Sequence, residues 1–239
     1  MGRELQGVLY YYLTNVRHAF LIFWLVIVAI FILSIVLDAL VGGDDMTIHF
    51  NLSFPIYIFA AALGFIVVKS TLPYLIKMGA TRKIIYIGTV IFFIVFSSIN
   101  ALLANALNWL LRKLTKSEIG GGFIYTNGEQ TTTFNHIADF LERDNFLYQI
   151  IVDLSLSFFF ITVFFIIGLM FYRFGLLGGF LFVGVIAFTF IYGMADGWLA
   201  EFFIDIFSDF TIAFFYQLAL VGFGVYLLSF FLLRRYTLQ

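Results

Sequence analysis

Serine and asparagine side chains interrupt a long apolar stretch near the middle of the chain, roughly residues 84–111: Ser97, Ser98, Asn100, Asn105 and Asn108. On a helix, Ser97, Ala101, Ala104 and Asn108 share one face, because their separations of four, three and four residues match its period. Hydroxyl and amide groups in apolar surroundings either join packed helices by hydrogen bonds or line a path for polar molecules. Helix packing is the favoured interpretation, and a translocation path is the alternative.

One carboxylate, Asp153, lies about two helical turns inside another apolar stretch, residues 146–172. A carboxylate in such surroundings is a candidate for function, because burial of its charge is costly. The depth is only about 10 Å by helical rise, however, so a hydrated carboxylate is at least as good an interpretation.

Catalytic groups do not converge in the apolar stretches. A hydrolase or metalloenzyme would need His, Glu or Ser side chains close together there, but His18, His49 and His136 lie at edges or in loops. Cys is absent, which excludes disulfides and thiolate metal sites. We therefore expect no catalytic residues and no metal or cofactor on this chain.

The segment Thr71–Lys83 is short, basic and rich in signals for a turn. Pro73 is predicted to break the preceding helix, and Tyr74 to Met78 to form one short helical piece. Gly79 suits the position after a helix end, and Thr81 suits the N-cap of the next helix. The pattern predicts a compact cationic knob, and a plain hairpin loop is the alternative.

Composition decides which elements carry these residues. Of 239 residues, 63% are hydrophobic and 11% are charged, against about 25% charged in soluble domains. One soluble core cannot bury that much apolar surface, so lipid must cover the rest. The sequence predicts an all-α integral membrane protein with a single domain, residues 1–239, and six spans, at roughly 19–41, 52–72, 84–111, 146–172, 175–195 and 210–233.

The distribution of Lys and Arg predicts that both termini are cytoplasmic. This orientation places nine cations inside: Arg3, Arg17, Lys69, Lys77, Arg82, Lys83, Arg173, Arg234 and Arg235. The other four, Arg112, Lys113, Lys116 and Arg143, are then outside. The net charge of −1 gives no indication of nucleic-acid binding.

Two amphipathic segments flank the spans. Residues 1–18, with Tyr10 to Tyr12 and flanking cations, are expected to lie in the headgroup layer, or else simply to anchor the first span. Before the last span, Trp198 and Phe202 alternate with Glu201 and Asp205, which predicts an amphipathic helix or an aromatic anchor at the outer interface. Gly175 and Gly179 form a Gly-x-x-x-Gly pair, which favours close helix approach.

Residues Leu75–Lys83 read Leu-Ile-Lys-Met-Gly-Ala-Thr-Arg-Lys, which resembles the Gly-x-Ser/Thr-Arg-Lys/Arg signature of small bacterial six-span permeases of ABC-type exporters. The ending Leu232-Leu-Arg-Arg235 is also similar to that family. In the family an interfacial elbow helix precedes the first span, a coupling helix joins the second and third, and an outer helix precedes the last. The long segment Arg112 to Asn145 is larger than the smallest members have.

The resemblance implies a permease in the bacterial plasma membrane that exports an amphipathic cargo, with a toxin or antimicrobial peptide favoured. Its coupling residues would be Tyr74, Lys77, Gly79, Ala80, Thr81, Arg82 and Lys83. The expected partners are the lipid bilayer, a cytoplasmic ATPase and a second permease chain, identical or related.

The chain has no Gly-x-x-x-x-Gly-Lys-Ser/Thr sequence, so it cannot cradle nucleotide phosphates in a P-loop. ATP and magnesium are therefore expected on the partner ATPase, and this chain is not expected to be an enzyme. Two alternatives stay open. An ion-coupled secondary transporter would usually show broken spans and deeper charges, and an intramembrane enzyme is less favoured still.

Overall fold

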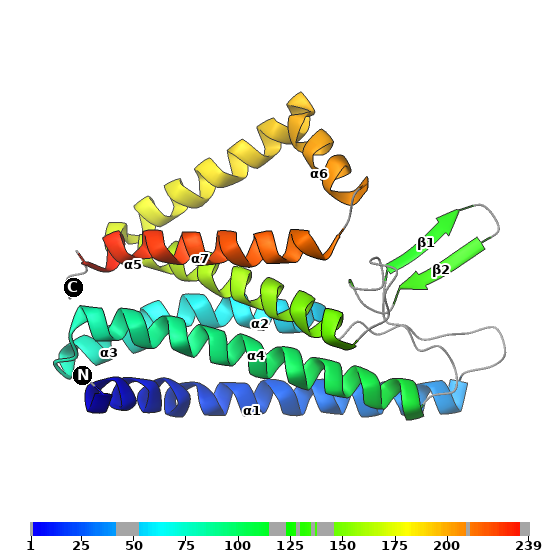
Figure 1. Cartoon of the computed structure of the whole chain (residues 1–239), viewed down its shortest axis with the longest axis horizontal. Helices are drawn as coiled ribbons and strands as arrows, with labels where there is room; N and C mark the ends of the chain where they lie inside the picture. The colour runs from blue at the N-terminus through cyan, green and yellow to red at the C-terminus, as the bar shows by residue number, and fades with distance from the viewer. Residues whose placement is uncertain are drawn as a thin grey trace.

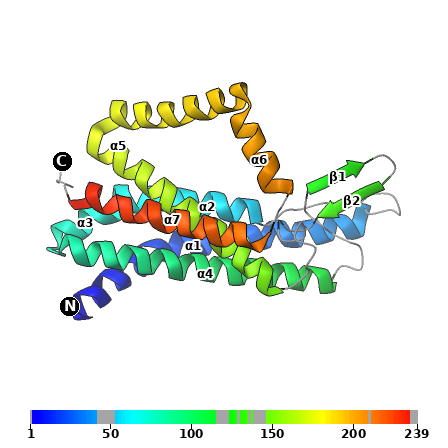
Figure 2. The ribbon, with the colours of Figure 1, turned by 45° about the horizontal axis from the view of Figure 1, so that its top comes forward.

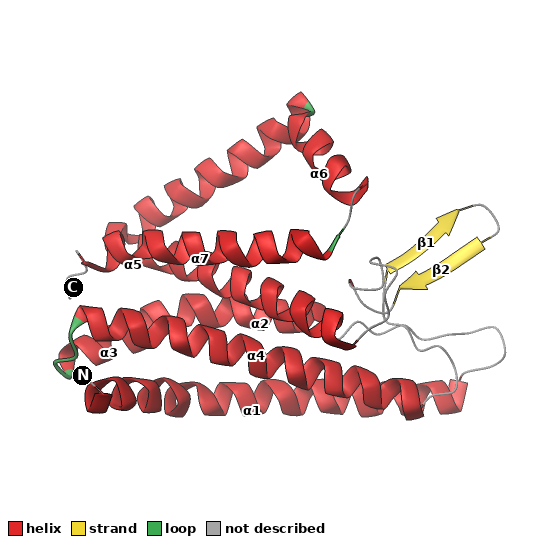
Figure 3. Ribbon diagram, viewed as in Figure 1, coloured by secondary structure: helices red, strands yellow, loops and turns green. Residues whose placement is uncertain are grey.

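The computed structural model describes residues 2–41, 53–114, 123–127, 130–134, 137, 146–208 and 211–234. Within these residues the chain is almost entirely helical, with one β-hairpin (Figure 3). The helices are α1 (Gly2–Val41), α2 (Ser53–Ile66), the π-helix η1 (Val67–Thr71), α3 (Leu72–Lys77), α4 (Arg82–Leu114), α5 (Phe146–Asp196), α6 (Trp198–Ser208) and α7 (Ile212–Arg234).

Five helical segments of the described part are long and apolar enough to cross a membrane. They are Gly2–Leu33, Ser53–Lys77, Arg82–Leu110, Phe146–Asp196 and Ile212–Leu233. Their lengths and apolar character support a multi-pass membrane protein.

The long helices form a bundle with two distinct ends (Figure 1). The N-terminus, α3, the bend of α5 and the end of α7 gather at one end, and the hairpin lies at the other (Figures 1 and 2). We call the first the basic end, because Arg3, Lys77, Arg82, Lys83 and Arg173 all belong to its segments.

The expected separate helix over residues 1–18 is absent, because α1 runs unbroken from Gly2 to Val41. No Gly or Pro lies between Tyr10 and Val41, so nothing in the sequence interrupts its hydrogen bonds. Figure 2 nevertheless shows that the first turns of α1 are inclined to the rest of the helix. At 40 residues, α1 is about 60 Å long and exceeds the thickness of a bilayer.

The expected break at Pro73 is also absent, since the helix continues through it into α3. The preceding residues form the π-helix η1, in which the Leu72 N–H donates to the Val67 carbonyl five residues earlier. In a regular α-helix the proline ring would clash with the Lys69 carbonyl. Lys69 lies inside the wider π turn, which gives the ring room and keeps the helix continuous.

A sharp bend divides α5 at Gly175, whose φ of 70° and ψ of −173° are not helical. The positive φ favours glycine. Beyond the bend, a Cβ on Gly179 would lie 2.2 Å from the Phe171 ring. The Gly-x-x-x-Gly pair therefore lets the two limbs of α5, before and after the bend, approach each other.

The helices agree with the predicted all-α class, and beside them β1 (Phe123–Asn127) and β2 (Gln130–Phe134) form one antiparallel hairpin. Phe123 pairs with Phe134, and Asn127 pairs with Gln130. The run of β-branched and aromatic residues explains the strands. Residues 42–52 and most of the rest of the 112–145 segment lie outside the described residues.

Candidate functional site

The turn between α3 and α4 ends α3 with a regular six-residue cap. The Ala80 N–H donates to the Leu75 carbonyl at 3.1 Å, and the Gly79 N–H donates to the Ile76 carbonyl at 3.0 Å. These two bonds define a Schellman motif. Gly79 has a φ of 83°, the left-handed conformation that the motif requires and that glycine adopts without strain. The prediction that Gly79 follows the helix end is confirmed.

The next helix begins directly after this cap. Thr81 precedes α4, and its carbonyl accepts the Ile85 N–H at 3.0 Å. Thr81 therefore occupies the N-cap position predicted from the sequence. Only three residues, Met78, Gly79 and Ala80, separate α3 from this cap, so the path of the chain is short and closely defined.

Buried contacts hold the turn on the bundle. Leu72 and Leu75 are at most 1% exposed and belong to the main hydrophobic core. Asn15 donates to the Thr71 hydroxyl at 3.0 Å and so links α1 to η1. The Tyr74 ring stacks on Tyr11 with centroids 4.5 Å apart. These contacts attach the α3–α4 turn to α1 directly and to α2 and α4 through the hydrophobic core.

The structure brings together all seven residues predicted for coupling. Ala80 is half-buried, and the other six are exposed: Tyr74, Lys77, Gly79, Thr81, Arg82 and Lys83. Three are cations, and residues 67–90 contain no acidic residue. Such a surface can pair with carboxylates of a protein partner or with lipid phosphates.

No protein-family model, curated protein sequence or solved structure matches this chain. The site is therefore interpreted from its own geometry.

A second group of residues lies inside the bundle, where polar side chains join different helices. Trp24 of α1 donates its indole N–H to Asn100 of α4 at 3.2 Å. Asn100, Ser97 and Asn105 are fully buried, whereas Asn108 is half-buried. Burial against neighbouring helices favours the packing interpretation, since the walls of an open aqueous path would be accessible to water.

Asp153 is the centre of this buried polar group. Its carboxylate accepts the Tyr57 hydroxyl of α2 at 2.5 Å and the Asn105 amide of α4 at 2.8 Å. The side chain is 1% exposed, so the hydrated interpretation of Asp153 is wrong. The Asn105 Oδ1 and Ser157 Oγ atoms are buried without a hydrogen-bond partner, which leaves the network incomplete in this conformation.

Sequence reasoning missed Tyr57 and Trp24 as the partners of these groups. A weak signal existed in α5, where Gln149, Asp153 and Ser157 recur every four residues and therefore share one helix face. Nothing comparable marked Tyr57, because an aromatic residue in an apolar stretch has the same pattern whether or not its hydroxyl is used.

Replacing Tyr57 by Phe is expected to lower the free energy of unfolding by about 1–2 kcal/mol, the scale of interhelical hydrogen bonds in membranes. The substitution keeps the ring and removes one donor to the Asp153 carboxylate. A reversible unfolding titration in mixed micelles would measure the change. Tyr216→Phe is the matched control, because Tyr216 is 52% exposed. Equal stability of the two variants would show that the Tyr57 contact contributes nothing.

The segment before α7 forms the helix α6, and Gly197 with a φ of 92° makes the turn into it. Glu201, Phe202 and Asp205 are exposed, and Trp198 is half exposed. A Cβ on Gly193 would lie 2.6 Å from the Trp198 ring, so the indole covers this glycine. These residues are far along the chain and in space from the α3–α4 turn (Figure 1).

Across the residues that the structure describes, no three His, Cys, Asp or Glu side chains are grouped closely enough to hold a metal ion. Within the described residues, the structure thus has a cationic surface at the basic end and a hydrogen-bonded interior.

Proposed function

We propose that this chain is the membrane-spanning permease subunit of an ATP-driven exporter. The observation that carries the proposal is the α3–α4 turn, a capped, cationic projection at the end of the bundle where α1 begins and α7 ends (Figure 1). A permease without its own P-loop must receive its conformational drive through such a contact. The resemblance of residues 75–83 to the exporter signature supports the same function.

The proposal includes six membrane crossings with both termini in the cytoplasm. Gly175 divides α5 into limbs that run from Phe146 to Phe174 and from Leu176 to Asp196, each of at least the roughly 20 residues that a span needs. Because the second limb exposes apolar side chains on all sides, including Leu177, Phe180, Val185 and Ile186, lipid is its natural surrounding. The basic end then faces the cytoplasm, in agreement with the positive-inside rule.

The coupling mechanism follows from the connections of the turn. A displacement of α3 is transmitted to α2 through the continuous helix Ser53–Lys77 and to α4 through the short link at Gly79. Within this continuous helix, the π-helix η1 is the segment that bends most easily, because π segments have poorer hydrogen bonding than the α-helix around them. ATP and magnesium bind to the partner ATPase, and movements of its surface reorient α2 and α4.

The partners are a cytoplasmic ATPase and a second permease chain in a bacterial plasma membrane. The apolar, aromatic interior suits an amphipathic cargo, with a toxin or antimicrobial peptide favoured. The outer residues Trp198, Glu201, Phe202 and Asp205 would lie at the exit side, and a path along α4 would pass Ser97, Asn100, Asn105 and Asn108 only after the helices separate.

Affinity purification of the tagged chain from its native membrane tests this function. The expected result is a stoichiometric soluble ATPase whose hydrolysis rises when the permease is present. A chain that purifies alone and whose activity depends on an ion gradient would contradict the proposal.

The second candidate is an ion-coupled secondary transporter, and one observation favours it. Asp153 is a buried carboxylate within a span and forms hydrogen bonds to two other helices, which is typical of coupling sites in such proteins. Transport by reconstituted protein that requires a proton or sodium gradient, and no ATPase, would establish this candidate. An intramembrane enzyme is less favoured than either, since catalytic groups do not converge in the sequence.

A further inference from the structure

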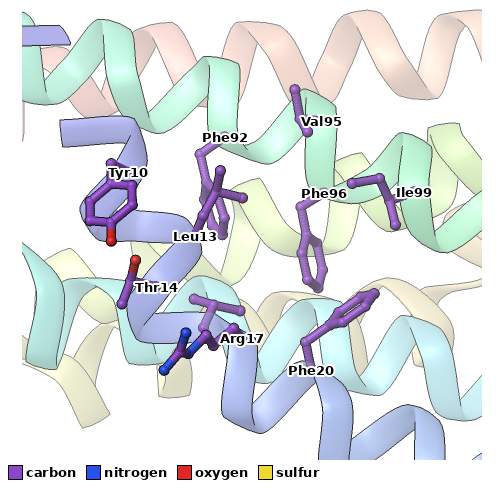
Figure 4. A pocket seen from close by; sticks show the side chains of 10 residues that line it. Tyr10, Leu13, Thr14, Arg17, Phe20, Phe92, Val95, Phe96 and Ile99 are labelled. Atoms are coloured by element: carbon purple, nitrogen blue, oxygen red, sulfur yellow. The ribbon is translucent and has the colours of Figure 1, made fainter. Parts of the chain in front are cut away.

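A groove between α1 and α4 opens on the side of the bundle. It has a volume of about 400 Å³, within the range of about 300–1,000 Å³ that ligand sites occupy. Its apolar wall comes from Phe20 of α1 and from Phe92, Phe96 and Ile99 of α4 (Figure 4). The wall includes exposed side chains, with Leu13 at 52% and Val95 at 42%, so the groove faces the bilayer.

The lining of this groove is almost wholly apolar, and three of its residues carry a polar group. The hydroxyls of Tyr10 and Thr14 and the guanidinium of Arg17 lie at one end, and Phe96 and Ile99 lie at the other (Figure 4). Tyr10, Thr14 and Arg17 belong to successive turns of α1, separated by four and three residues, so the helix presents them on one face. Donors at one end and an apolar trough at the other match the two ends of a lipid.

Arg17 gives the groove its charge preference. Its side chain is exposed, and within the described part of the chain Arg17 forms no hydrogen bond or ion pair. Neither residues 5–37 nor the whole of α4 contains an acidic residue. A guanidinium beside lipid and without a protein carboxylate is best neutralised by a phosphate, which its fork of N–H donors fits.

We infer that this groove binds an anionic glycerophospholipid of the leaflet at the basic end. The phosphate contacts Arg17 and the Tyr10 and Thr14 hydroxyls, and one acyl chain lies along Phe92, Phe96 and Ile99. The inference requires only that the chain spans a membrane, and it is independent of the ATPase.

A lipid is a better occupant than a transported peptide for two reasons. The exposed residues of the wall face the bilayer, where lipid is always the most concentrated ligand. The polar groups are also few and lie at one end, whereas a peptide in an apolar groove would need partners for its backbone along the whole length. The experiment must therefore distinguish binding of a lipid in the groove from binding of cargo.

Trp24 provides a local reporter, because its ring centroid lies 6.1 Å from that of Phe20 in the groove wall. With Trp109 and Trp198 replaced by Phe, the full chain is reconstituted in phosphatidylcholine vesicles that contain brominated phosphatidylglycerol or brominated phosphatidylcholine. Bromine on an acyl chain in the groove quenches Trp24 fluorescence. The expected result is stronger quenching by phosphatidylglycerol, with a relative association constant of about five, the contribution of one cation at a membrane surface.

Three variants decide between explanations. Arg17→Gln should remove the preference for phosphatidylglycerol, whereas Arg3→Gln, which changes the net charge equally on the same helix, should keep it. Val95→Phe fills the trough and should reduce quenching by both lipids while the protein elutes as a folded particle. An unchanged preference in Arg17→Gln overturns the inference. The inference is also overturned if neither lipid quenches Trp24 in the folded chain. That result is expected if the groove binds cargo instead of lipid.

Discussion

Replacing Gly64 by Ala is expected to destabilise the bundle severely, and replacing it by Leu is expected to prevent folding. A Cβ at Gly64 of α2 would lie 2.2 Å from the carbonyl oxygen of Ile161 and 3.1 Å from the backbone nitrogen of Phe165, both in α5. Since the opposing atoms are backbone, no side-chain rotation relieves the clash. The helices must move apart and lose the contacts around Leu63, Val68 and Phe165 that form the core.

We expect Gly64→Ala to cost at least the upper end of the range of about 1–3 kcal/mol for overpacking. The thermal midpoint of the purified protein, followed by size-exclusion chromatography, measures the effect. Gly184→Ala and Gly224→Ala are matched controls, because both glycines lie in helices and a Cβ there meets no atom within 4 Å. These controls should match the parent or exceed it slightly, since Ala has the higher helix propensity. A Gly64→Ala midpoint equal to theirs would refute the close approach of α2 and α5.

Changing Gly79 to Val and Arg82 to Glu together is expected to abolish cargo-stimulated ATP hydrolysis while membrane insertion persists. Open space surrounds Gly79, but its φ of 83° is unfavourable for a residue with a Cβ, by about 1–2 kcal/mol in the left-handed region. The valine therefore distorts the Schellman turn without clashing. Glu at position 82 reverses the charge of the docking surface. An acidic residue in the first turn of α4 suits its dipole, so this change does not unfold the helix.

The measurement is hydrolysis by the reconstituted pair with and without cargo, together with recovery of the ATPase on the tagged permease. Hydrolysis should fall to the rate of the ATPase alone, and recovery should decrease. Gly79→Asn controls for the backbone, because Asn tolerates the left-handed conformation. Arg3→Glu controls for charge at the same end. Normal association and transport in the double variant would reduce the α3–α4 turn to a loop without a coupling role.

The sequence determined features that depend on neighbours along the chain. The six apolar stretches predicted as spans correspond to five helical segments that are long and apolar enough to cross a membrane, because residues 146–172 and 175–195 both lie in α5. The end of α3 at Gly79 was also predictable, because a cap is formed by six consecutive residues whose hydrogen bonds are local. Pro73 was misjudged for the same reason: the local rule assumes a regular α-helix, and η1 is not regular.

Tertiary structure decided everything that depends on how the helices are rotated against one another. Asp153 could not be assigned a hydrated or a buried position from its depth alone, because that choice depends on whether Tyr57 and Asn105 face it. Gly64 was one glycine among 20 in the sequence, and only the packing of α2 against α5 shows that it permits a backbone contact. The groove at Arg17 exists because side chains of α1 and α4, which are distant in sequence, line it together. Periodicity specifies which residues share a helix face, but the partner of that face is specified by packing between segments distant in sequence.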